Sequence, residues 1–85
     1  MNEEKIKEKL EELKGQDVFI LINGVITLTL MYKGFDYFMN KNRFLICNIE
    51  GNEINIETSS IEKIEADDIK VIIKLDNEQQ IFIQL

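Results

Sequence analysis

The chain lacks the residue types on which much of enzyme chemistry depends. Its 85 residues include no histidine, no tryptophan and a single cysteine, Cys47. Catalytic triads and Cys–His pairs that need an imidazole are therefore excluded, and so are zinc sites built from histidine or several cysteines. Carboxylates remain, but Asp67 and Asp68 lie in a turn-like stretch and are interpreted as solvated charges. We therefore predict no enzymatic activity, no cofactor and no bound metal.

Other absences bear on the compartment. No apolar run approaches the ~18 residues needed to span a bilayer. Residues 1–15 are charged throughout, unlike a signal peptide. Cys47 has no second cysteine with which to form an internal disulfide, and this fits a reducing compartment. Its position in FLICNI predicts a small core hydrophobe, not a reactive thiol. We therefore expect a cytoplasmic protein.

Length and composition predict one α+β domain spanning residues 1–85. Fifteen isoleucines favour strands, and the abundance of Ile, Lys and Asn suits an AT-rich bacterial or phage genome. Residues 1–49 carry seven basic and seven acidic groups, whereas residues 50–85 carry three and nine. An acidic second half repels phosphate, so a broad basic field for nucleic acid is absent. Any contact with RNA has to be local and built from base stacking.

The first segment predicts a helix over residues 3–14. Asn2 is a suitable N-cap, and the acidic residues that follow it favour the positive end of the helix dipole. One narrow apolar stripe consists of Ile6, Leu10 and Leu13. Gly15 supplies a typical stop. Such a helix must lie on another element, either the sheet of this domain or a neighbouring subunit.

From residue 17 onward the apolar period changes to two, which predicts strands. The runs 18–22 and 25–32 flank Asn23-Gly24, and this dipeptide predicts a two-residue hairpin turn with positive φ at both positions. Gly34 interrupts the extended stretch that continues to residue 39. A glycine at this point predicts a sharp bend inside the longest strand.

Two further hairpins are predicted, one across Gly51-Asn52 between residues 43–50 and 53–58, the other between residues 69–75 and 80–85. Ile61 and Ile64 predict either one helical turn or a tight corner into a short strand. The predicted core consists of Ile20, Ile26, Leu28, Leu30, Ile54, Ile56, Ile61, Ile64, Val71 and Ile73.

Five of the seven aromatic residues lie between Tyr32 and Phe44. Strand alternation places Asp36, Phe38 and Asn40 together on one face. An exposed ring can stack on a base, and an amide can read a base edge. The alternative is that Phe38 belongs to the core and that Asn40 begins a turn.

Residues 16–65 resemble the Sm-like proteins, the group that contains the Sm and LSm proteins and bacterial Hfq. The resemblance is carried by LINGVITLTLMYKGFDYFMN (21–40) and by INIETSSIEKI (54–64). It implies a helix followed by a strongly bent antiparallel small β-barrel, of Sm-like or SH3-like form. Residues 69–85 then form an extra C-terminal hairpin beyond the usual end of the family.

The resemblance also implies rings of six or seven subunits, and a uridine site at which Phe38 stacks, Asn40 forms hydrogen bonds and Asp36 orients Asn40. Three cations, Lys33, Lys41 and Arg43, lie near the phosphates in this interpretation. The sequence departs from the family where Glu57-Thr58 replaces an Arg-Gly pair, and where Leu30 replaces a glycine.

Two functions stay open on the sequence. One is a divergent Sm-like homo-oligomer that binds U-rich single-stranded RNA through Asp36, Phe38, Asn40, Lys41 and Arg43. The other is an acidic protein-interaction module that binds no RNA and whose second half meets a basic partner. A phage-type inhibitor that imitates nucleic acid fits this second description equally well.

Overall fold

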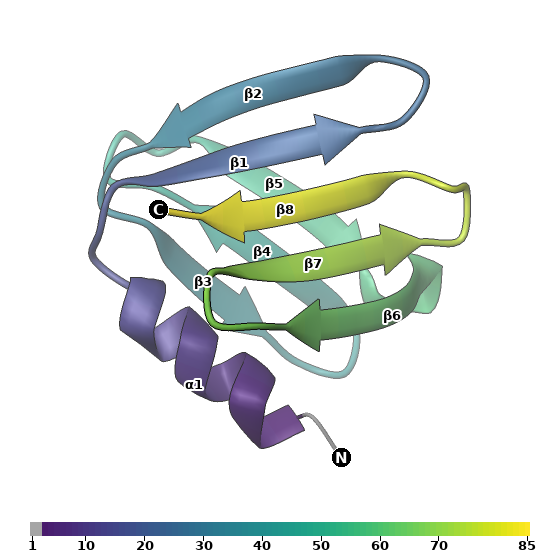
Figure 1. The fold of residues 1–85 in the computed structure, drawn as a ribbon, viewed down its shortest axis with the longest axis horizontal. Coiled ribbons are helices and arrows are strands. Elements are labelled where there is room, and N and C mark those ends of the chain that lie inside the picture. The colour runs from purple at the N-terminus through teal and green to yellow at the C-terminus, as the bar shows by residue number, and fades with distance from the viewer. Residues whose placement is uncertain (1–2) are drawn as a thin grey trace.

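The computed structural model describes residues 3–85 and has one helix followed by eight strands (Figure 1). The elements are α1 (Glu3–Leu13), β1 (Val18–Asn23), β2 (Thr27–Tyr32), β3 (Asp36–Met39), β4 (Arg43–Cys47), β5 (Glu53–Glu57), the 3₁₀ turn η1 (Thr58–Ser60), β6 (Ile61–Ala66), β7 (Lys70–Leu75) and β8 (Gln80–Gln84). The predicted α+β class and the predicted hairpins are confirmed. Ile61 begins a short strand directly after the single turn η1.

The strands form two antiparallel sheets that face each other. The five-stranded sheet has the order β2-β1-β8-β7-β6, and the three-stranded sheet has the order β3-β4-β5. Figure 1 shows the five-stranded sheet in front, the three-stranded sheet behind it and α1 across one end. The two sheets are not closed into a barrel.

The C-terminal hairpin is not an appendage to this fold. β8 lies between β1 and β7, with Leu21 opposite Phe82 on one side and Ile72 opposite Phe82 on the other. The hairpin predicted over 69–85 does form, but it supplies the central strand of the larger sheet. In this position β8 pairs the N-terminal strand β1 with the C-terminal hairpin, so segments far apart in the sequence lie side by side.

Helix α1 packs through the predicted apolar stripe, because Ile6, Leu10 and Leu13 are all buried. Lys9 Nζ donates to the backbone oxygen of Asp68 at 2.6 Å and so fixes the helix to the β6–β7 turn. The proposed cap Asn2 lies outside the described residues. No helix within residues 3–85 is long and apolar enough to cross a membrane.

The core lies between the inner faces of the two sheets and is closed at one end by α1. Four predicted core residues are fully buried or nearly so: Ile20, Ile56, Val71 and Ile73. Four others pack partly buried against them: Leu30, Ile54, Ile61 and Ile64. The prediction is wrong for Ile26 and Leu28, which are 69% and 50% exposed. Ile26 lies in the loop between β1 and β2, and Leu28 lies near the loop end of the edge strand β2.

The prediction of a two-residue turn at Asn23-Gly24 is also wrong. Asn23 pairs with Thr27 as the last rung of the ladder, which leaves residues 24–26 as a three-residue loop. Gly24 is not among the glycines with positive φ. Thr27 Oγ1 donates to Asn23 Oδ1 at 3.1 Å, and this contact holds Asn23 inside the strand.

Gly34 lies at a sharp bend, as predicted, with a φ of +59°. The bend breaks the strand, so that β2 and β3 belong to different sheets. A Cβ atom at this position would collide with the side chain of Ile49. The Gly34 N–H donates to Asp17 Oδ1 at 3.1 Å, which fixes the bend to the start of β1.

Candidate functional site

The residues predicted to bind RNA lie on the outer face of the three-stranded sheet and in the turn beside it. Phe38 is 51% exposed and stands opposite Leu45, which in turn faces Asn55 on β5. The interpretation of Phe38 as a core residue is therefore wrong. Its ring is accessible to a ligand.

Asn40 has a structural role that limits its use in recognition. Its Oδ1 atom accepts hydrogen bonds from the backbone N–H groups of Asn42 at 2.7 Å and Arg43 at 2.9 Å. Asn40 therefore begins the β3–β4 turn, as the alternative interpretation predicted. Asp36 Oδ1 accepts from the N–H of Tyr37 at 2.8 Å, and within residues 3–85 it makes no hydrogen bond to Asn40.

Acidic groups dominate this outer face. Asp36 and Glu53 flank Cys47 across the sheet, and Glu57 stands opposite Arg43. Burial, followed by the charges of Asp36 and Glu53, raises the pKa of the Cys47 thiol. The thiol is therefore protonated and weakly nucleophilic at neutral pH.

Two predicted cations line an open depression beside this face. It has a volume of about 620 Å³ and lies between the β3–β4 turn and η1, with Lys41, Arg43 and Glu57 among its lining residues. Thr58 Oγ1 donates to the backbone oxygen of Lys41 at 2.6 Å, which holds the turn against η1. The two cations and the Glu57 carboxylate therefore share one small region.

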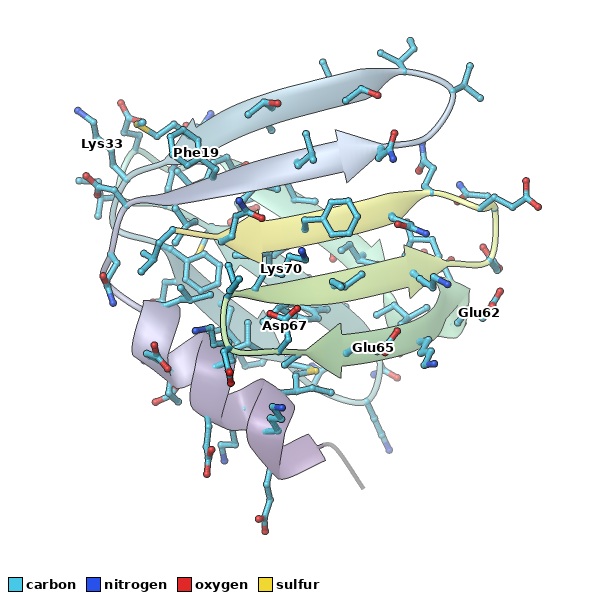
Figure 2. All side chains as sticks on the ribbon, viewed as in Figure 1. Phe19, Lys33, Glu62, Glu65, Asp67 and Lys70 are labelled. Carbon is cyan, nitrogen blue, oxygen red and sulfur yellow. The ribbon has the colours of Figure 1, made fainter. Side chains whose placement is uncertain are left out.

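The outer face of the five-stranded sheet has a different character. Phe82 stands at its centre, opposite Leu21 on β1 and Ile72 on β7. Phe19 is a diagonal neighbour of Phe82 on the adjacent strand, and it is 43% exposed. Met31 extends this apolar row onto β2, where it stands opposite Phe19. The face is turned toward the viewer in Figure 2.

This face carries a small excess of lysines although the chain as a whole is acidic. The register places Lys63, Lys70 and Lys74 on it, together with Glu65, which is paired to Lys63 at 3.6 Å. Glu62, at the register shift of β6, borders the same face beside Lys74 and Gln80. Lys70 Nζ lies 5.9 Å from the centroid of the Phe82 ring, a cation–π distance. The other polar groups are uncharged amides and hydroxyls, from Asn23, Thr27, Thr29, Gln80 and Gln84. Aromatic rings, cations and amides therefore share one open surface.

Sequence patterns did not reveal this second face, because its two aromatic residues come from opposite ends of the chain. Phe19 and Phe82 become neighbours only when β8 inserts beside β1. One signal was present in the sequence. Strands β1 and β8 carry apolar residues on both faces, whereas a strand open to water on one side usually alternates with polar residues.

Four of the nine acidic residues of the second half lie along one edge of the same sheet. Glu62, Glu65, Asp67 and Asp68 lie along β6 and in the β6–β7 turn (Figure 2). Asp67 Oδ1 accepts from the N–H groups of Ile69 and Lys70, both at 2.8 Å, and these bonds lower the pKa of Asp67. Asp67 is thus engaged in the turn and Glu65 in an ion pair. Within residues 3–85 no cluster of acidic and cysteine side chains is arranged to hold a metal ion.

Comparison with models of protein families, with curated proteins and with solved structures finds no significant match to this chain. The resemblance of residues 16–65 to the Sm-like proteins therefore rests on its sequence motifs and stays a prediction.

Proposed function

We propose that this protein binds single-stranded RNA on the outer face of its five-stranded sheet. The observation that carries the proposal is the pairing of Phe19 and Phe82 on adjacent strands, within a surface that also presents lysines and amides. Diagonal neighbours across a strand pair lie about 7–8 Å apart, close enough for both rings to contact one short segment of RNA. Each stacked base contributes roughly 1–3 kcal/mol to binding.

The charge distribution supports this face over the one predicted from the sequence. The strands of the larger face carry three lysines with Glu65 and, at the register shift, Glu62, whereas the smaller face carries Asp36, Glu53 and Glu57 against Arg43 alone. Lysines beside the stacked bases are within reach of the phosphates. Because the whole chain carries a net charge of −6, we expect moderate affinity that falls as salt rises.

Amide groups provide the means to read bases. Gln84 stands opposite Phe19, and Gln80 lies on the other side of Phe82 along β8, opposite Asn23. Side-chain amides donate and accept hydrogen bonds at the edges of unstacked bases. The assignment of RNA as the nucleic acid draws on the Sm-like resemblance, which is supported by the sharp bend at Gly34 ahead of FDYFMN. A distant Sm-like relationship, with its bent small barrel, is part of this proposal.

A protein-interaction module is the second candidate, and one observation favours it. Glu62 near the start of β6 and Asp68 in the turn after its end lie at opposite ends of the edge that also carries Glu65 and Asp67. An acidic edge of this kind suits a basic protein partner. An inhibitor that imitates nucleic acid belongs to the same class.

Fluorescence anisotropy with a labelled U-rich RNA of about a dozen nucleotides tests the proposal. We expect wild type to bind, and Phe82→Ala and Phe19→Ala each to weaken binding by roughly 5- to 150-fold, the equivalent of about 1–3 kcal/mol. Phe38→Ala is the matched control, since it removes a ring from the other sheet that is 51% exposed, compared with 43% for Phe19. We expect it to leave the affinity unchanged. Circular dichroism confirms that each variant is folded.

Other results would point elsewhere. Loss of binding in Phe38→Ala alone, together with tighter binding by Glu57→Arg, places the site on the three-stranded sheet as the sequence predicted. Equal affinity for the matching DNA strand means that the 2′-hydroxyl is not read. Absence of any binding by wild type overturns the RNA proposal. Capture of a basic protein that depends on Glu62 and Asp68 then supports the second candidate.

A further inference from the structure

The two sheets end in four edge strands, β2 and β6 in the larger sheet and β3 and β5 in the smaller one. An edge strand presents unpaired backbone N–H and C=O groups that can pair with another chain. Natural proteins guard such edges with charged residues, bulges, short strands or a covering element.

Three of the four edges are guarded in this way. β6 carries three charged residues and a register shift between Ile61 and Lys63, and α1 packs against it. β3 has only four residues and begins with Asp36. β5 begins with Glu53 and ends with Glu57. None of these strands presents a long uncharged edge.

β2 has none of these protections. Its six residues, TLTLMY, include no charge, proline or glycine, and all six pair in unbroken register with β1. The described residues include ten exposed large hydrophobic side chains, and four of them fall between positions 25 and 31. These are Val25 (103% exposed), Ile26 (69%), Leu28 (50%) and Met31 (53%). The open edge therefore coincides with the densest run of exposed apolar side chains.

We infer that β2 is the pairing edge of a homodimer, in which β2 of a second copy adds antiparallel to it about a two-fold axis at Thr29. Residues opposite each other in an antiparallel pair point to the same side of the sheet. A two-fold axis at Thr29 places Leu28 opposite Leu30 of the second copy on the inner side. On the outer side, Thr29 stands opposite its own counterpart and Thr27 opposite Met31.

The chemistry of the edge favours a second copy as the occupant. The sequence of β2 is almost the same in both directions around Thr29. Two antiparallel copies of β2 therefore place leucine opposite leucine on one side of the sheet, and neither copy brings a charged residue to the pairing. Cross-strand pairs of this kind each contribute roughly 0.2–1 kcal/mol. Two acidic chains approach with least repulsion along an uncharged strand. Pairing also covers Leu28, which the monomer leaves half exposed.

The inference does not depend on RNA binding, and mass in solution tests it. One chain has a mass of 10.0 kDa, so we expect light scattering to give about twice that value for wild type, decreasing on dilution. Thr29→Lys places two like charges opposite each other across the axis. Because Thr29 is exposed, we expect this variant to remain folded and to be a monomer.

Asn55→Lys is the matched control, since Asn55 is an exposed residue in the middle of β5, another edge strand. It makes the same change in charge and is expected to leave the dimer intact. A second readout uses Thr29→Cys in a Cys47→Ser background. We expect oxidation to link this variant into a covalent dimer, because position 29 faces its own counterpart.

Wild type that stays at 10.0 kDa at every concentration overturns the inference. A six- or seven-subunit particle does so as well, because two-fold pairing of one edge closes at two copies. If Asn55→Lys dissociates the dimer and Thr29→Lys does not, the interface lies at β5, and this result also overturns the inference.

Discussion

The two sheets share one core but differ sharply on their outer faces. The inner faces merge, with Phe44 and Ile46 of the smaller sheet and Ile73 and Ile83 of the larger one all fully buried. The outer face of the larger sheet is aromatic with a small excess of lysines, and that of the smaller sheet has more acidic than basic residues around one phenylalanine. The inner faces of both sheets are constrained by packing in the core. The outer faces are free of that constraint, so their side chains can be selected for binding a ligand.

Removal of residues 69–85 gives the largest expected effect and tests whether the two sheets are separable. The deletion takes away β7 and the central strand β8, and leaves β1 and β6 without their shared neighbours. We expect the shortened chain to be unfolded by circular dichroism, because Val71, Ile73, Ile81 and Ile83 of the core are lost. A cooperative thermal transition in the shortened chain would show instead that residues 16–65 fold alone, as the Sm-like resemblance implies.

A pair of phenylalanines sharpens the comparison between inner and outer faces. Phe44 is fully buried on β4, whereas Phe38 is 51% exposed on β3, the strand that pairs with it. We expect Phe44→Ala to lower the free energy of unfolding by about 3–5 kcal/mol. Phe38→Ala should cost well under half of that. Urea denaturation of both variants measures the two values, and equal losses would contradict the assignment of the faces.

The smallest expected effect concerns one tyrosine on each inner face. Burial and the hydrogen bond donated to the Glu11 carboxylate raise the pKa of Tyr37 to about 12, from an ordinary value of 10.0. Burial also raises the pKa of Tyr32. Because the unfolded chain ionises first, the contribution of Tyr37 to stability is complete below pH 10 and is lost as the pH rises toward 12.

Ultraviolet titration of wild type and Tyr37→Phe measures this difference. We expect the variant to lack the ionisation near pH 12, and its stability to change less between pH 10 and 12 than that of wild type. If the ionisation that Tyr37→Phe removes occurs near pH 10 in wild type, the contact between α1 and β3 does not persist in solution.

Local patterns in the sequence predicted much of the fold. The helix ends at Leu13, one residue before the predicted end, and Gly34 marks the sharp bend. Alternation assigned Ile54 and Ile56 to the inside and the charged residues of β5 to the outside. These features depend on residues close together in the chain, where spacing and turn chemistry decide the outcome.

The remaining features depend on contacts between distant residues. Alternation places Leu28 on the inner face of β2, but it does not reveal that β2 is an edge strand on which this residue stays 50% exposed. Asn23-Gly24 is a strong turn signal, yet the Thr27 hydroxyl holds Asn23 in the ladder. The candidate site was missed for a similar reason, because Phe19 and Phe82 meet only through the insertion of β8.

The central position of β8 also affects how this protein is made. While a ribosome is still adding residues 70–84, β1 and β2 have already been synthesised but lack the neighbour that completes their sheet. Chains dominated by such non-local pairing fold slowly, because the long intervening loop must close first. We therefore expect the pairing of β8 with β1 and β7 to be a late step of folding, and these two strands to lack their shared neighbour until β8 is in place.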